Sequence, residues 1–207
     1  VAMASRLDFA QPGPLKHLVW RQCPVPQPGP GEVLIEVRAA GLNFRDVMYA
    51  MGLLSDEAVE SGYAGPTLGM ELSGCVRALG EGVVGLQPGD DVIAFAPASL
   101  STYTVTGAGA VMRKPDGWSF EAAATVATTF FTVYYALHHL ARLEEGERIL
   151  IHGAAGGVGI AAIQFAKYKG AEIFATAGSD EKRDVVRMLG ADHVMDSRSL
   201  AFADEIL

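Results

Sequence analysis

The chain has 207 residues, of which 50% are hydrophobic and 19% are charged, and its formal net charge is −8. This composition is ample for a buried core in one or two domains. The acidic balance and the lack of a dense basic cluster argue against nucleic-acid binding. No run reaches the roughly 18 apolar residues of a membrane span, and the N-terminus is not a signal peptide. We therefore expect a soluble cytoplasmic protein without a membrane partner.

Few residues could bind a metal. Cys23 and Cys75 are too few for a disulfide framework or a four-thiolate zinc site. None of the five histidines pairs with another at a ligand spacing such as H-x-x-x-H, and the adjacent His138 and His139 point to different sides of a helix. We expect no metal.

The N-terminal part, residues 1–118, contains short β-type runs between turn signals such as PQPGPGE and LQPGD. Short strands at this spacing predict a small, partly open β-barrel. One helical segment interrupts them at residues 44–51, and Asn43 precedes it as a candidate N-cap. The predicted strands cover residues 33–37, 72–78, 91–96 and 102–105.

The sequence pattern changes from short β-type runs to a helical pattern at Ser119. This residue precedes a long apolar segment that we predict as one helix. Strand and helix patterns then alternate through residues 149–196, as in a doubly wound parallel sheet. We therefore predict an α/β fold in which a Rossmann-type domain covers residues 119–207. Only two or three strands are present, whereas a complete dinucleotide fold has about six. We expect a truncated domain that is either a fragment or one piece of a longer polypeptide. Residues 1–207 alone should be weakly active or inactive in any reaction that uses the dinucleotide.

The glycine-rich turn has the spacing Gly153-x-x-Gly156-Gly157-x-Gly159, after a short apolar strand and before an alanine-rich helix. Glycines let the backbone approach a pyrophosphate, and the helix N-terminus directs N–H groups at the anion. A tight turn without a ligand is the alternative. The predicted dinucleotide contacts are Gly153, Ala154, Gly156, Gly157, Val158 and Gly159.

The next strand, residues 172–177, ends without the Asp or Glu that would hold the ribose 2′-hydroxyl of NAD. It is followed instead by Ser179, Lys182 and Arg183, which suit a 2′-phosphate. These residues predict NADPH as the cofactor. The alternative is that Lys182 and Arg183 are solvated residues in the first turn of a helix.

Several separate blocks resemble one family. The order of β-rich domain, long helix, glycine turn and AGSDEKR is similar to the medium-chain dehydrogenase/reductase superfamily. Residues 43–48, NFRDVM, resemble enoyl reductase domains of type I polyketide synthases, and the iterative synthases of methyl-branched lipids look most similar. Further matches are residues 69–74, 89–92 and 135–137. The resemblance implies a GroES-like domain followed by a Rossmann domain.

The resemblance also implies an activity: NADPH-dependent reduction of a trans-2-enoyl thioester held on an acyl carrier protein. It places Asn43 near the nicotinamide or the thioester, where its alternative role is the helix cap. It places Thr132 near the nicotinamide, where the alternative is a packed β-branched residue. Arg45 and Asp46 are expected to form a structural ion pair, and His152 is expected to be a packed or capping residue.

The proton donor is not identified by the sequence. Modular polyketide enoyl reductases often carry a tyrosine where this chain has Leu54, and leucine cannot donate a proton. Tyr49 lies on the same segment, but we do not assign it this role.

Other functions stay open. A zinc-independent NADPH:quinone oxidoreductase shares this framework, and a non-catalytic NADPH-binding module is a third candidate. The expected partners are the carrier-bound thioester and the other domains of a synthase. The oligomeric state stays open, with a homodimer as one candidate.

Overall fold

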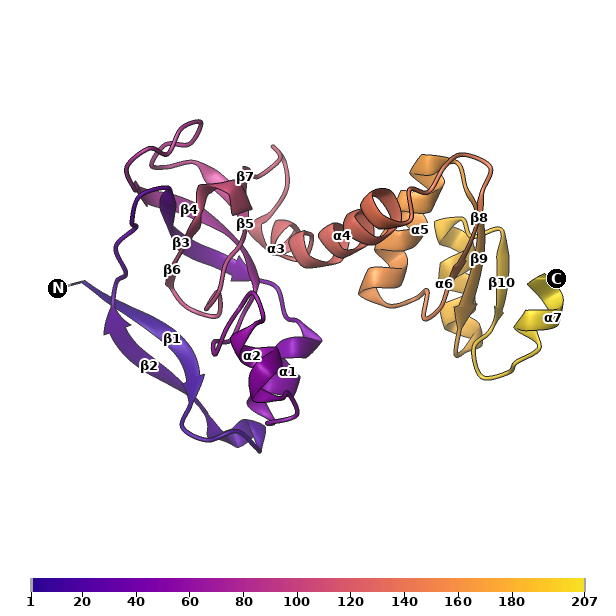
Figure 1. The fold of residues 1–207 in the computed structure, drawn as a ribbon, viewed down its shortest axis with the longest axis horizontal. Coiled ribbons are helices and arrows are strands. Elements are labelled where there is room, and N and C mark those ends of the chain that lie inside the picture. The colour runs from indigo at the N-terminus through magenta and orange to yellow at the C-terminus, as the bar shows by residue number, and fades with distance from the viewer. Residues whose placement is uncertain (1, 207) are drawn as a thin grey trace. The chain divides into compact units, whose positions relative to one another are not determined.

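In the computed structural model (Figure 1), residues 2–206 are described, and the chain divides into two compact units. The first unit is Val1–Thr128 and the second is Thr129–Leu207. Each has its own hydrophobic core. The predicted boundary between residues 118 and 119 falls inside the first unit and stays a prediction. Within residues 2–206, no helix combines the length and apolar character needed to cross a membrane.

The first unit is built on a five-stranded antiparallel sheet with the order β6-β3-β4-β5-β7. Its core strands alternate inward apolar residues, among them Val33, Ile35, Leu72, Val76 and Val92, which are fully buried. The four predicted strands are confirmed, and β7 is added. The strands are β3 (Glu32–Ala40), β4 (Glu71–Leu79), β5 (Asp91–Phe95), β6 (Tyr103–Gly107) and β7 (Val111–Arg113).

An N-terminal hairpin lies outside the predicted elements. It pairs β1 (Met3–Phe9) with β2 (Leu18–Pro24) in antiparallel register. Most β2 side chains are exposed, so the strand has no inward and outward alternation from which to predict it. Two short helices, α1 (Phe44–Ala50) and α2 (Asp56–Glu60), follow β3, and α1 confirms the predicted helical interruption. Two single 3-10 turns lie at Leu15–His17 and Ala108–Ala110.

The long helix predicted from Ser119 is wrong as one continuous element. Ser119 does cap a helix, because its hydroxyl accepts from the Ala122 N–H at 3.1 Å. That helix ends after five residues, where Thr125 donates its hydroxyl to the Ala122 carbonyl and the β-branched Val126 follows. The segment is divided into α3 (Phe120–Ala124), α4 (Ala127–Val133) and a π-helix, η3 (Tyr134–Leu140).

The second unit contains a parallel sheet with the order β10-β9-β8. This is the 3-2-1 order of the first half of a dinucleotide-binding fold. Figure 1 shows α5 and α6 on one side of the sheet, where Ile163 and Val186 are fully buried. The elements are β8 (Arg148–Ile151), α5 (Gly157–Lys169), β9 (Glu172–Ala177), α6 (Asp180–Leu189), β10 (His193–Asp196) and α7 (Phe202–Ile206). The predicted alternation of strands and helices is confirmed.

Candidate functional site

The glycine-rich turn connects β8 to α5, as predicted. Gly153 has φ +62°, a left-handed conformation that a residue with a side chain rarely adopts. Ala154 is fully buried, and its N–H donates to the Thr176 carbonyl on β9 at 3.0 Å. A Cβ on Gly159 would lie 2.6 Å from the Ala154 Cα, so the first turn of α5 packs directly against the loop. The turn therefore needs glycine at positions 153 and 159.

A cavity of about 240 Å³ lies beside this turn. The first N–H groups of α5 have no partner within the helix, and the helix dipole is positive at this end. An anionic pyrophosphate fits such a site, since three glycines leave part of the cavity wall without side chains. The lining residues are Gly153, Ala155, Gly156, Ala177, Gly178 and Lys182. The structure thus brings Lys182 to the same cavity as the glycine turn.

Ser179 and Arg183 do not line this cavity. The Ser179 hydroxyl caps α6 by accepting from the Lys182 N–H at 3.4 Å. It also lowers the pKa of the Glu181 carboxyl through a hydrogen bond. The Arg183 guanidinium lies 2.6 Å from the Asp180 carboxylate and 3.4 Å from the Asp196 carboxylate. Since Arg183 also donates to the Ala177 carbonyl at 3.1 Å, its charge is used to join α6 to the ends of two strands.

Arg198 is a second cation near the cavity, and it is absent from the residues predicted for the site. Its Nε lies 3.2 Å from the position that a Cβ on Gly178 would occupy. Both Arg198 and Lys182 are exposed, and within residues 2–206 neither side chain forms an ion pair. A basic residue just after the third strand is a signal that could have identified Arg198 from the sequence.

Thr132 lines a different cavity, of about 170 Å³, in the second unit. It is an exposed residue of α4, and the same cavity includes Val158 from the first turn of α5. The remaining wall is formed by Val133, Ala136, Leu137, Ile149, Leu150, Ile151 and Ala162. Thr132 and the glycine-rich segment therefore meet at one cavity along β8.

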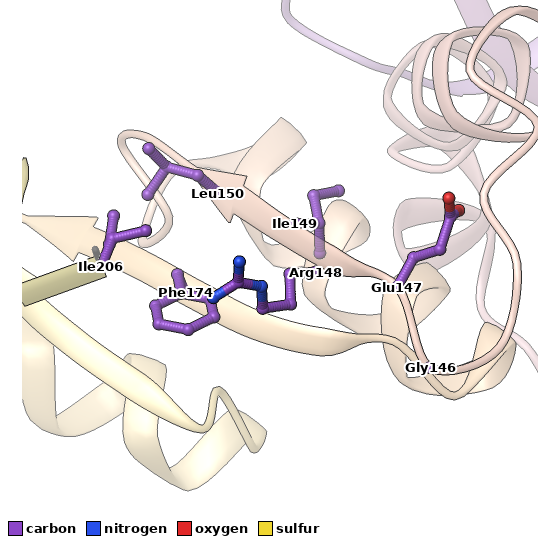
Figure 2. Close-up of a pocket in the computed structure, with 7 residues that line it drawn as sticks. All are labelled: Gly146, Glu147, Arg148, Ile149, Leu150, Phe174 and Ile206. Carbon is purple, nitrogen blue, oxygen red and sulfur yellow. The ribbon is translucent and has the colours of Figure 1, made fainter.

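Figure 2 shows a larger cavity, of about 520 Å³, that contains none of the predicted site residues. It lies along β8, which pairs only with β9 among the described strands. The Arg148 guanidinium lies over the Phe174 ring, 6.0 Å from its centroid, and Leu150 and Ile206 form an apolar side. Glu147 also lines this cavity, but neither the glycine-rich turn nor any other residue predicted for the site does, so we keep it apart from the candidate site.

His152, at the end of β8, is held by neighbours in the second unit. Its Nδ1 lies 3.0 Å from the Thr176 hydroxyl, and its ring meets the Phe202 ring edge-on at 5.1 Å. His152 is nevertheless exposed, so its assignment as a packed or capping residue stays a prediction.

In the first unit, Asn43 stands at the N-terminus of α1. Its backbone N–H donates to the Asp46 carboxylate at 3.3 Å, as in a capping box. Its side-chain Nδ2 donates to Glu71 Oε1 at 2.9 Å. Asn43 is half-buried. The predicted cap position is confirmed, and the structure adds Glu71 as a partner that the sequence does not indicate.

Arg45 and Asp46, in the first turn of α1, bind the backbone of the loop at residues 65–69. Arg45 donates to the carbonyls of Gly65 and Thr67, and Asp46 accepts from the Gly69 N–H at 2.8 Å. The two side chains lie 3.9 Å apart, so the expected structural ion pair is present. The Arg45 guanidinium also lies over the Tyr49 ring, 4.8 Å from its centroid.

Comparison with known proteins identifies the family. The family model "Alcohol dehydrogenase GroES-like domain" matches residues 29–142, and "Zinc-binding dehydrogenase" matches residues 157–207. Within residues 2–206, no three His, Cys, Asp or Glu side chains are grouped as metal ligands would be. One relative is a phenolphthiocerol/phthiocerol polyketide synthase protein from Mycobacterium tuberculosis, which is 44% identical over 99% of this chain. The chain spans 9% of that relative's length.

Solved structures of related proteins also resemble this chain in sequence and fold. The CurK enoyl reductase is 44% identical with a TM-score of 0.92, over 98% of this chain and 62% of that one. A quinone oxidoreductase from Coxiella burnetii is 31% identical with a TM-score of 0.88, over 100% of this chain and 66% of that one. A mycobacterial protein solved in complex with NADPH is 29% identical with a TM-score of 0.80, over 93% of this chain and 58% of that one. The chain belongs to the alcohol dehydrogenase-like, medium-chain dehydrogenase/reductase superfamily, with a GroES-like domain and a Rossmann-type sheet.

Proposed function

We propose that this chain is the enoyl reductase region of a type I polyketide or fatty acid synthase. Its substrate is a trans-2-enoyl thioester on an acyl carrier protein, and its product is the saturated acyl chain. The observation that carries this proposal is the likeness to the CurK enoyl reductase, at 44% identity and a TM-score of 0.92. The partners would be the carrier protein and neighbouring synthase domains, and a homodimer is one candidate assembly.

The cofactor in this proposal is NADPH, which when bound supplies a hydride for the β-carbon of the enoyl group. The turn from Gly153 to Gly159 and the N-terminus of α5 would hold the pyrophosphate. Lys182 and Arg198 would hold the 2′-phosphate, because both cations lie beside Gly178 and form no ion pair within residues 2–206. Ser179, as the N-cap of α6, and Arg183, in its first turn, would support that site. We place Thr132 at the nicotinamide end of the cofactor. We also propose a GroES-like domain at residues 1–118 and a Rossmann-type domain, which includes Thr132, at residues 119–207.

The residue that we propose for the thioester is Asn43. Negative charge builds on the thioester oxygen when the β-carbon is reduced, and a positioned hydrogen-bond donor stabilises that charge. The Asn43 amide has two N–H groups, and Glu71 accepts from one of them. The second N–H would donate to the thioester oxygen. Leu54 cannot protonate the α-carbon, so the acid lies elsewhere.

A quinone oxidoreductase activity is the second candidate, favoured by the likeness to the Coxiella burnetii protein at 31% identity. A non-catalytic NADPH-binding module is the third. The three functions differ in what they do with the same cofactor, so one set of assays separates them.

The test uses the whole protein that carries this chain. We expect NADPH oxidation with crotonyl thioester and little with 1,4-benzoquinone. Turnover of the quinone alone would favour the oxidoreductase. Tight NADPH binding, seen as a change in NADPH fluorescence, without turnover of either substrate would favour the binding module. Either of these two results overturns the proposed function.

A further inference from the structure

Glu71, the first residue of β4, is a buried carboxylate with two separate partners. It is 2% exposed. Its Oε1 accepts from Asn43 Nδ2 at 2.9 Å, and its Oε2 accepts from the backbone N–H of Thr128 at 2.8 Å. All three residues belong to the first unit. One carboxylate therefore holds both the Asn43 amide and the last backbone segment of that unit.

The surroundings of Glu71 fit a glutamate closely. A Cβ on Gly41 would lie 2.5 Å from both Cγ and Oε1 of Glu71, so only glycine leaves room for this side chain. The Gly41 N–H donates to the Glu71 carbonyl at 3.2 Å, which fixes the backbone next to the carboxylate. Burying a carboxylate is costly unless it is hydrogen-bonded, and here each oxygen has an N–H donor.

The chemistry of a carboxylate determines how Asn43 is turned. An ionised carboxylate only accepts hydrogen bonds, so Asn43 must direct its NH2 end at Glu71 and not its carbonyl oxygen. We propose that Glu71 is a positioning residue, which orients the Asn43 amide so that its second hydrogen faces the thioester oxygen. This inference rests on the proposed function, in which Asn43 stabilises that oxygen.

The variant Glu71→Gln tests the inference, because glutamine has nearly the same size but offers one acceptor and one donor. It can satisfy the Thr128 N–H or the native Asn43 amide, but not both, so Asn43 loses its fixed orientation. In the whole protein we expect kcat for enoyl-thioester reduction to fall at least about tenfold, and KM for NADPH to change less than about twofold.

A matched control is Ser73→Ala on the same strand. Ser73 is fully buried, and its hydroxyl donates to the Val92 carbonyl at 2.8 Å, so the variant loses a buried hydrogen bond without touching Asn43. We expect a lower Tm with unchanged kcat. If Glu71→Gln behaved in the same way, with a lower Tm and full kcat, Glu71 would be merely structural and the inference would be overturned.

A double variant adds a readout that does not depend on activity. Asn43→Asp alone would place two carboxylates face to face and lower the Tm. In Asn43→Asp/Glu71→Gln the hydrogen bond is restored with its direction reversed, so we expect the Tm to recover while kcat stays low. Additive Tm losses with an active wild type would overturn this inference alone. A wild type without enoyl-thioester turnover would overturn the proposed function, and the positioning role with it.

Discussion

Gly159 and Ala154 are in backbone contact where the glycine-rich turn enters α5. A Cβ on Gly159 would lie 2.6 Å from Cα and 2.7 Å from the carbonyl carbon of Ala154, a separation that real Cβ atoms essentially never show. Ala154 cannot retreat easily, because it is fully buried and its N–H is bonded to β9. The contact therefore sets the position of the first N–H groups of the helix relative to the turn.

Gly159→Ala should destabilise the protein and weaken NADPH binding together, because the helix must move away from the turn. Overpacking of this kind costs about 1–3 kcal/mol of unfolding free energy. Gly157→Ala is the matched control for stability, since its Cβ would lie at an ordinary 3.5 Å from Thr129 Cγ2. Alanine is better than glycine in a helix by up to about 1 kcal/mol, so this variant should be at least as stable as the wild type. Equal losses in chemical denaturation would refute the packing argument.

Lys182→Ala and Arg198→Ala should each weaken NADPH binding at least about tenfold, since a charge-assisted contact to phosphate contributes about 1.5–3 kcal/mol. NADH lacks the 2′-phosphate, so its binding should change little. Fluorescence titration with both cofactors measures the difference. Equal losses for NADPH and NADH would remove these residues from a 2′-phosphate site.

Arg183→Ala should behave differently from both, because its guanidinium already contacts Asp180, Asp196 and the Ala177 carbonyl. We expect a lower unfolding free energy and a similar, smaller loss of affinity for NADPH and NADH. Loss of NADPH binding alone, with stability intact, would instead place Arg183 on the phosphate.

The contrast between Arg183 and Lys182 shows what the sequence could predict about the site. The bounds of β9 and α6 are determined locally, because Ser179 caps the helix and Gly190 ends it with φ 97°. The use of the Arg183 charge is only partly local, since Asp180 lies three residues earlier in α6 but its second partner, Asp196, comes from another strand. Composition near the strand end indicated cations but could not tell which of them form ion pairs.

In the first unit, too, local elements could be predicted from the sequence but long-range contacts could not. Its sheet was predictable from alternating strands between proline and glycine turns, whereas the β1–β2 hairpin lacks that alternation. Asn43 was identified by its position before a helix, but its partner Glu71 lies on a strand far along the chain. Neither propensity nor spacing reports a hydrogen bond of that kind. The break at Thr125 was missed because the apolar run was interpreted as one helix, although Thr125 and the β-branched Val126 have low helical propensity.

Arg45→Lys should lower the unfolding free energy by about 1–2 kcal/mol, because lysine cannot reach two carbonyls with a planar fork or stack as well on Tyr49. The control is Arg38→Lys, whose exposed ion pair with Glu36 should contribute less than about 1 kcal/mol. Urea denaturation of both variants provides the comparison. Indistinguishable midpoints would mean that Arg45 does not hold the Gly65–Thr67 loop.

Thr132 offers the clearest separation of its two candidate roles, because its hydroxyl and its shape can be changed independently. Thr132→Val keeps the branched shape and removes the hydroxyl, whereas Thr132→Ser keeps the hydroxyl and removes the methyl group. If the hydroxyl contacts the nicotinamide end of the cofactor, kcat/KM for NADPH should fall about tenfold in the valine variant and little in the serine variant. Thr132 lines its cavity with Val158 and Ile151, so a purely packed residue would give the reverse order, with serine the more damaging change. Steady-state kinetics with crotonyl thioester distinguishes the two orders, and the reverse order would leave Thr132 with no part in cofactor binding beyond packing.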